Sequence, residues 1–189
     1  MEKLVFCFHR KSGLGRREFF DHYLQHHAPL GMRLTTSMQG YTINLTDLGV
    51  PDPGAPDAIT EIWTGSARDF MDAEKSFATP EDAATLMADH NSFIGPFDVY
   101  VVQERIVRTD DAIGPAKRVA LYGPGERPPT PGPEVVSQVE QQVVQELMSR
   151  SAPVELIMTT TARSIEGLGP RSTRSYDVSE HQLMEPQFD

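Results

Sequence analysis

The chain has 189 residues, of which 39% are hydrophobic and 23% are charged, and its formal net charge at pH 7 is −10. This length is enough for one sizeable core, and no apolar run approaches the ~18 residues that a membrane-spanning helix needs, so we expect no membrane association. The negative charge gives nucleic acid no electrostatic reason to bind, and the N-terminus MEKLVFCFHRK becomes polar too early for a secretory signal, so we expect a cytoplasmic globular protein.

The first 108 residues predict elements in the order β-α-β-β-α-β. Apolar side chains recur at positions 19, 20, 23, 24 and 27 with the spacing of one helical face, and Pro29 is expected to end this helix. Short runs of apolar or alternating residues predict the strands. The predicted strands cover residues 3–9, 40–48, 58–65 and 98–107, and the predicted helices cover residues 16–27 and 66–94, the second being interrupted near Pro80.

This order is typical of a ferredoxin-like α+β fold, in which two helices cover one face of a four-stranded antiparallel sheet. The other face would be apolar and open. We therefore expect a homodimer, or an internal pseudo-dimer in which the rest of the chain covers that face.

Residues 111–189 are predicted to form a C-terminal extension of a domain at residues 1–110. AKRVALYG and VELIMTTTA read as strands on either side of a helix over residues 134–150, which gives a β-α-β fragment. The fragment is either an unrelated extension or a degenerate second copy of the first unit. The polar tail from Gly167 is expected to be an arm, or to add an edge strand through RSYDVSEHQLM.

Three stretches of residues 1–108 resemble the EthD family. The motif residues shared with the family are Phe19, Tyr23, His27 and Pro29 in one run, Glu61-Ile62-Trp63 at a strand end, and Asp89 with Phe93 on the second helix. The resemblance implies ferredoxin-like domains that dimerise into an α+β barrel. It also implies a link to ether degradation, or to dehydration and decarboxylation of aromatic polyketides. Similar barrels include cofactor-free isomerases, cyclases, oxygenases and haem-binding proteins, so fold alone selects no reaction.

Two histidines are expected to point from the helices toward the sheet. His27 falls at the centre of the apolar stripe of the first helix, and His90 falls near the middle of the stripe of the second. A neutral imidazole at the mouth of a hydrophobic cleft suits general acid–base catalysis, although either residue could be a core histidine bonded to a backbone carbonyl. Tyr23, Trp63 and Phe93 are the predicted substrate-binding walls of this cleft.

His22 and His26 fall on the other side of the first helix and are expected to face solvent. With Glu18 they form an i, i+4, i+8 row that could hold a metal, but no fourth ligand is nearby, so no metal is predicted. GLGRRE follows a strand as a dinucleotide-binding loop would, yet Glu18 replaces its third glycine, and no cofactor is predicted. Cys7 lies in an apolar run and is expected to be a small buried residue.

These features predict a cofactor-independent enzyme of the lyase, dehydratase or isomerase type, with a small hydrophobic substrate that is aromatic or polyketide-like. His27 and His90 would be its catalytic residues. The alternative is a non-catalytic small-molecule or haem-binding accessory protein of an oxidative degradation pathway. Turnover without metal or cofactor would favour the enzyme, and a haem complex with an axial histidine would favour the accessory protein.

Overall fold

Eight strands among the described residues close into one antiparallel barrel, in the order β1-β3-β2-β8-β5-β7-β6-β4. The computed structural model describes residues 1–46, 54–109, 114, 116–150, 152–164, 166–168 and 174–186. The strands are β1 (Glu2–Arg10), β2 (Met38–Thr46), β3 (Ala58–Thr64), β4 (Ile94–Arg108), β5 (Ala116–Tyr122), β6 (Val135–Met148), β7 (Leu156–Ala162) and β8 (Ser175–Met184).

The predicted ferredoxin-like α+β fold is wrong, although the first four strands lie close to where the sequence placed them. The sheet does not end at β4 and β2. Instead β6 pairs with β4, and β8 pairs with β2, so both edges continue into strands from the second half of the chain. Closure satisfies the backbone donors and acceptors that an open sheet leaves unpaired at its edges.

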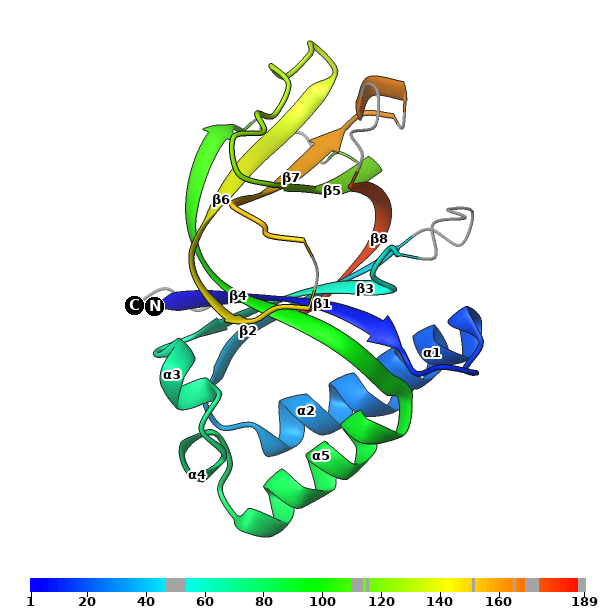
Figure 1. The fold of residues 1–189 in the computed structure, drawn as a ribbon, viewed down its shortest axis with the longest axis vertical. Coiled ribbons are helices and arrows are strands. Elements are labelled where there is room, and N and C mark those ends of the chain that lie inside the picture. Colours follow the sequence, from blue (N-terminus) through cyan, green and yellow to red (C-terminus); the bar gives the residue numbers. More distant parts are fainter. Residues whose placement is uncertain are drawn as a thin grey trace.

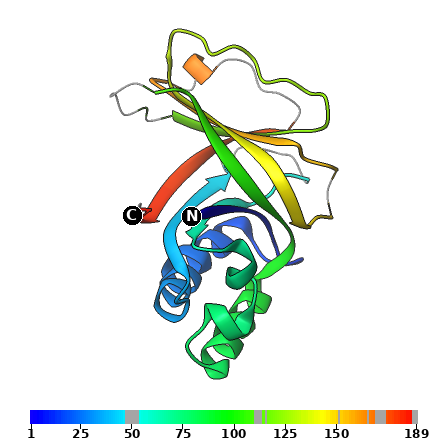
Figure 2. The same ribbon diagram turned by 90° about the vertical axis from the view of Figure 1, so that its left-hand side faces the viewer.

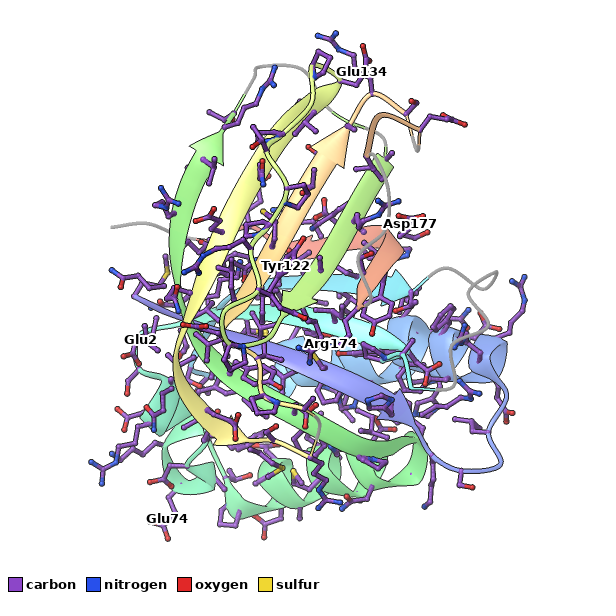
Figure 3. All side chains as sticks on the ribbon, turned by 45° about the horizontal axis from the view of Figure 1, so that its top comes forward. Glu2, Glu74, Tyr122, Glu134, Arg174 and Asp177 are labelled. Atoms are coloured by element: carbon purple, nitrogen blue, oxygen red, sulfur yellow. The ribbon has the colours of Figure 1, made fainter. Side chains whose placement is uncertain are left out.

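Helices cover one side of the barrel, against the outer face of β1 to β4, while β5, β6 and β7 lie at the far end (Figures 1 and 2). The helical segments on this side are α1 (Arg16–His22), the π-helix η1 (Tyr23–His27), α2 (Ala28–Leu34), α3 (Ala67–Phe70), α4 (Ala73–Ser76) and α5 (Pro80–Phe93). The short 3₁₀ turn η2 (Glu166–Leu168) lies beside β5 and β7 at the other end. Figure 3 shows Glu74 on the helical side and Tyr122, Glu134 and Asp177 in the part of the barrel away from it.

The first helix does not end at Pro29 as expected, because a π turn precedes the proline. The backbone N–H of Ala28 donates to the carbonyl of Tyr23, five residues earlier, and Pro29 then lies in the first turn of α2. A proline inside an α-helix lacks a donor and its ring clashes with the carbonyl four residues before it. We infer that the wider π turn accommodates the ring at this point, so that the helix continues to Leu34.

The predicted helix over residues 134–150 is also wrong, since this segment is strand β6. Its apolar residues have a spacing that suits a helix, but many of them are β-branched valines, which pack well on a pleated surface. β6 pairs with β4 on one side and β7 on the other. The tertiary pairing therefore decides its conformation, and the predicted β-α-β extension is a set of barrel strands.

The two larger apolar clusters lie on opposite faces of the sheet. On β1, Leu4, Phe6 and Phe8 pack under the helices. Val5 and Cys7 point inward, into a cluster to which β5, β7 and β8 also contribute. Cys7 is buried, as expected, and burial raises the pKa of its thiol to about 12.

The face that was expected to need a second copy is the inside of this barrel. Strands from residues 116–184 cover it, which removes the reason for predicting a homodimer.

Several sequence expectations concern the ends and connections. β8 lies between β2 and β5, so this part of the tail is neither an arm nor an edge strand. The boundary predicted between residues 110 and 111 lies outside the described residues, as do residues 49–53 of a predicted loop. No helix within the described part of the chain is long and apolar enough to cross a membrane.

Candidate functional site

A cleft of about 320 Å³ lies between the helices and the outer face of the barrel. This volume is near the lower end of the range for small-molecule sites. No Asp, Glu, Lys or Arg lines the cleft among the described residues. Its walls are mainly aromatic or aliphatic, and include Phe6 and Phe8 of β1, Tyr41 of β2, Ile62 of β3, Phe97 of β4, and Tyr23, His27, Leu86 and His90 of the helices.

His27 is a polar residue of this cleft that a hydrogen bond to a neighbouring helix holds in place. Its side chain is 9% exposed, and its Nδ1 lies 2.8 Å from Oδ2 of Asp89. The hydrogen bond joins the π turn to α5, and the Phe93 ring packs against the imidazole with centroids 5.0 Å apart. With the proton on Nδ1 donated to the carboxylate, the lone pair of Nε2 is left for other partners.

Burial and hydrogen bonding shift the pKa of each residue of this pair in opposite directions. Burial lowers the pKa of His27, and the hydrogen bond and charge of Asp89 offset this only in part. Burial raises the pKa of Asp89, but hydrogen bonds from His27 and His22 outweigh it, so the net pKa lies below its ordinary value. At neutral pH the pair is therefore a neutral imidazole and an ionised carboxylate.

His90 faces His27 across the cleft, with ring centroids 5.7 Å apart. Its ring also contacts Phe8 and Phe97 edge-on, with centroids 5.7 and 5.3 Å away. Burial, together with the proximity of His27, lowers the pKa of His90 to about 4. The imidazole ring of His90 forms no hydrogen bond with any other described residue, so both ring nitrogens can serve a ligand.

Tyr23 lines the cleft but its hydroxyl is engaged elsewhere. The hydroxyl lies 2.7 Å from Oγ1 of Thr60 and accepts a hydrogen bond from Tyr41 at 3.4 Å. These hydrogen bonds lower the pKa of Tyr23, but burial outweighs them and raises it to about 12. Tyr23 is therefore a protonated wall residue whose hydroxyl is already hydrogen-bonded to Thr60 and Tyr41.

The other two predicted wall residues lie outside the cleft surface. Phe93 is buried behind it and packs on Tyr23 and His27. Trp63 points to the opposite face of β3 from Ile62, and its ring lies 4.3 Å from Nζ of Lys3. The structure thus brings together His27, His90 and Tyr23, supports them with Phe93, and does not bring Trp63 to them.

The π turn explains which residues a regular helical count misplaces. In a π-helix the backbone bond runs from residue i to i+5, so residues five apart lie near one another along the helix. His22 was expected to face solvent, yet its Nε2 lies 2.8 Å from Oδ1 of Asp89. Asp89 is one of the residues shared with the EthD family. It forms hydrogen bonds with both histidines. His26 is exposed, as expected.

The entrance of the cleft carries exposed methionines from three separate segments, which are the turn after α3, the helix α5 and the strand β6. Met71, Met87 and Met148 all line the cleft and are 42%, 47% and 37% exposed. Methionine side chains are flexible and polarisable, so they adapt to ligands of different outline. The entrance therefore suits apolar ligands without imposing a single shape.

A metal at the predicted row of Glu18, His22 and His26 has no support in the structure. His22 is turned toward Asp89. No group of three or more His, Cys, Asp or Glu residues within the described ranges has a geometry that could hold a metal ion.

Comparisons with known proteins confirm the resemblance found in the sequence. Residues 11–96, a little under half of the chain, match the family described as the EthD domain. No curated protein matches the chain. A solved structure described as an anthrone oxidase-like protein is 10% identical, with a TM-score of 0.59, and the match covers 98% of this chain and 94% of that one.

A second solved structure, described as a candidate monooxygenase from Lactobacillus acidophilus NCFM, is 8% identical, with a TM-score of 0.43. The match covers 95% of this chain and 93% of that one. At these identities the likeness to the first structure concerns the fold, and it extends over both halves of the chain.

Proposed function

We propose, from the premise that residues 11–96 are an EthD domain, that this protein is an enzyme that transfers protons on an uncharged aromatic molecule bound in the cleft. The observation that carries the proposal is the His27–Asp89 hydrogen bond of 2.8 Å beside an apolar cleft. A carboxylate on Nδ1 orients the imidazole and stabilises the imidazolium that forms when Nε2 accepts a proton. His27 is then the general base.

The reaction that fits this arrangement is removal of a proton from a carbon activated by a carbonyl group. The C–H bond breaks, the proton passes to Nε2 of His27, and the electron pair moves into the carbonyl to give an enolate. His90, neutral because of its low pKa, can donate a ring N–H to the enolate oxygen. Loss of a leaving group from the enolate gives a lyase or dehydratase, and return of the proton to another carbon gives an isomerase.

Two features support an aromatic, uncharged substrate. The described lining has aromatic rings on both the strand side and the helix side, and it lacks ionised side chains. A charged ligand would lose its hydration there without gaining a partner. The protein described as anthrone oxidase-like shares the fold, which makes anthrone, a tricyclic ketone with an acidic CH₂ group, a reasonable first probe.

The test is exchange of the acidic C–H of anthrone, and of smaller aromatic ketones, for deuterium in D₂O without oxygen, followed by NMR. We expect the protein to accelerate exchange, and His27→Gln to lower the rate by about 100-fold or more. His26→Gln is the matched control, because His26 is the exposed neighbour on the same turn, and it should keep the full rate. A His27→Gln variant as fast as the wild type would overturn the proposal.

The alternative, a haem-binding accessory protein, has one observation in its favour. Metal-ligating histidines commonly donate the N–H of their second ring nitrogen to a carboxylate, as His27 does to Asp89. The cleft volume of about 320 Å³ favours a ligand smaller than a tetrapyrrole. Titration with haemin decides between the two. A haem absorption band that depends on His27, without any exchange activity, would support the accessory protein.

A further inference from the structure

A single carboxylate holds two histidines of the same helix. Asp89 Oδ2 lies 2.8 Å from Nδ1 of His27, and its Oδ1 lies 2.8 Å from Nε2 of His22. The exposed fraction of the side chain rises along this hydrogen-bonded series, from 9% for His27 to 19% for Asp89 and 31% for His22. The three groups run from the cleft outward.

His22 is held in place on its other sides as well. Its ring packs on Phe93 with centroids 4.5 Å apart, and Phe93 in turn packs on His27. It does not line the cleft, so a bound ligand has no contact with it. Any effect of His22 on the chemistry has to pass through Asp89 or Phe93.

The double contact restricts Asp89 more than one hydrogen bond would. One donor leaves a carboxylate free to turn about its side-chain torsions, whereas two donors on its two oxygens fix both its position and its plane. A fixed carboxylate then keeps the proton of His27 on Nδ1, because only that tautomer donates to it. The opposite tautomer would place the proton on Nε2 and remove the base.

We propose that His22 is a positioning residue that fixes Asp89 and, through it, the Nδ1–H tautomer of His27. The inference rests on the proposed role of His27 as a base, and it assigns a function to a residue that no ligand touches. The π turn is the device that makes the arrangement possible. Residues 22 and 27 are five apart, and this spacing brings two side chains of one helix to the same acceptor.

The experiment uses the full-length protein with ¹⁵N-labelled histidine, in three variants. His22→Leu removes the donor to Asp89. His22→Gln keeps an N–H donor of similar reach, and His26→Leu changes the exposed neighbouring histidine, whose ring lies 5.2 Å from that of His22. The imidazole nitrogen resonances of His27 report its tautomer directly, and the deuterium exchange of anthrone reports the chemistry.

We expect His22→Leu to mix the two tautomers of His27 and to lower kcat by about 10- to 100-fold with little change in KM, because a misoriented base costs rate and not affinity. His22→Gln should restore most of both signals, and His26→Leu should leave both unchanged. A merely structural role would instead lower the melting temperature and leave the His27 resonances of the folded fraction as they are.

The outcomes separate this inference from the proposed function. If His27→Gln is inactive while His22→Leu keeps both the rate and the Nδ1–H signal of His27, the function stands and the role of His22 is refuted. If His27→Gln remains active, the proposed function fails, and the NMR signals alone still show whether His22 fixes the tautomer. Should His22→Leu fail to fold, His22→Phe takes its place, because it keeps an aromatic ring against Phe93 but has no donor for Asp89, and the same changes in tautomer and rate are expected.

Discussion

At the scale of single residues, burial sets the protonation state of the cleft. His27 and His90 lie close to one another in apolar surroundings, and burial lowers the pKa of both. Two imidazolium ions at this separation would also repel each other. Both rings are therefore neutral at pH 7, one with its proton directed to Asp89 and the other without a hydrogen-bond partner among the described residues.

The low pKa of His90 predicts an acid-dependent loss of stability. Its pKa is about 4 in the folded protein against an ordinary 6.5, so the unfolded chain binds the proton first as the pH falls. Stability should thus decrease between pH 6.5 and 4, by up to roughly 3 kcal/mol. Replacing His90 with Gln should remove this part of the slope, as measured by urea unfolding at a series of pH values. An unchanged slope in the variant would show that His90 titrates normally.

At the scale of secondary-structure elements, a network of charged side chains centred on Glu61 links five strands of the barrel. Lys3 of β1 forms ion pairs with Glu61 of β3 and with Glu104 of β4, the latter at 2.6 Å. Lys117 of β5 lies 3.8 Å from Glu61 and also pairs with Glu180 of β8. Strands from the two halves of the chain are thus joined through one buried carboxylate.

Glu61 should make the barrel sensitive to acid in a window below that of His90. Burial raises the pKa of Glu61, but the charges of Lys3 and Lys117 and a hydrogen bond from Asn44 outweigh it and lower the pKa from 4.5 to about 2. Because the folded pKa is the lower one, the stabilisation is complete above pH 4.5 and is lost as the pH falls to 2.

Replacing Glu61 with Gln should lower the free energy of unfolding at pH 7 by about 3 kcal/mol. It should also weaken the dependence of that free energy on pH below pH 4.5. Glu180→Gln is the control, since Glu180 is 44% exposed and an exposed ion pair contributes at most about 1 kcal/mol. Chemical denaturation of both variants across this pH range provides the measurement. Equal losses of unfolding free energy in the two variants would mean that the buried Glu61 stabilises the protein no more than the exposed Glu180 does.

At the scale of the whole molecule, closure of the barrel replaces the partner that an open sheet would need. The inner apolar cluster contains Val5 and Ile59 from the first half of the chain and Val119, Ile157 and Tyr176 from the second. Neither half can bury these side chains alone. The helices, and with them most of the cleft, are attached to strands of the first half. The second half supports these strands from the opposite face of the sheet and also adds Met148 of β6 to the cleft lining.

Deleting residues 111–189 should therefore cause aggregation, because it exposes the inner face of β1 to β4 and leaves β4 and β2 as open edges. Solubility, melting temperature and light scattering of the truncated chain give the outcome, and light scattering of the full-length chain measures its oligomeric state. A truncated protein that stays soluble with an unchanged melting temperature would show that the second half is not integrated into the fold.

The sequence by itself determined the local features of this protein. Alternation and apolar runs located six of the eight strands and gave a strand at β8 as one of two alternatives, because these patterns follow from which side of a pleated strand meets an apolar core. The same kind of count placed His27 and His90 toward the sheet, where both line the cleft. The spaced motif residues indicated the EthD domain before any contact between them was known.

Only the tertiary structure decided the features that depend on pairing between distant segments. β6 has a helical apolar spacing and becomes a strand because β4 and β7 offer it hydrogen-bond partners on both sides. The sheet closes because β8 and β6 extend its two edges, which no local pattern reports.

The same limit applies within the site. The π turn brings His22 to Asp89, whereas a count of 100° per residue places His22 in solvent. Trp63 follows Ile62 on β3, and which of the two reaches the cleft depends on which face of the sheet the helices cover. Periodicity shows that a side chain faces an interior, but a barrel with helices on its outside has two interiors, and long-range packing decides which one a residue joins.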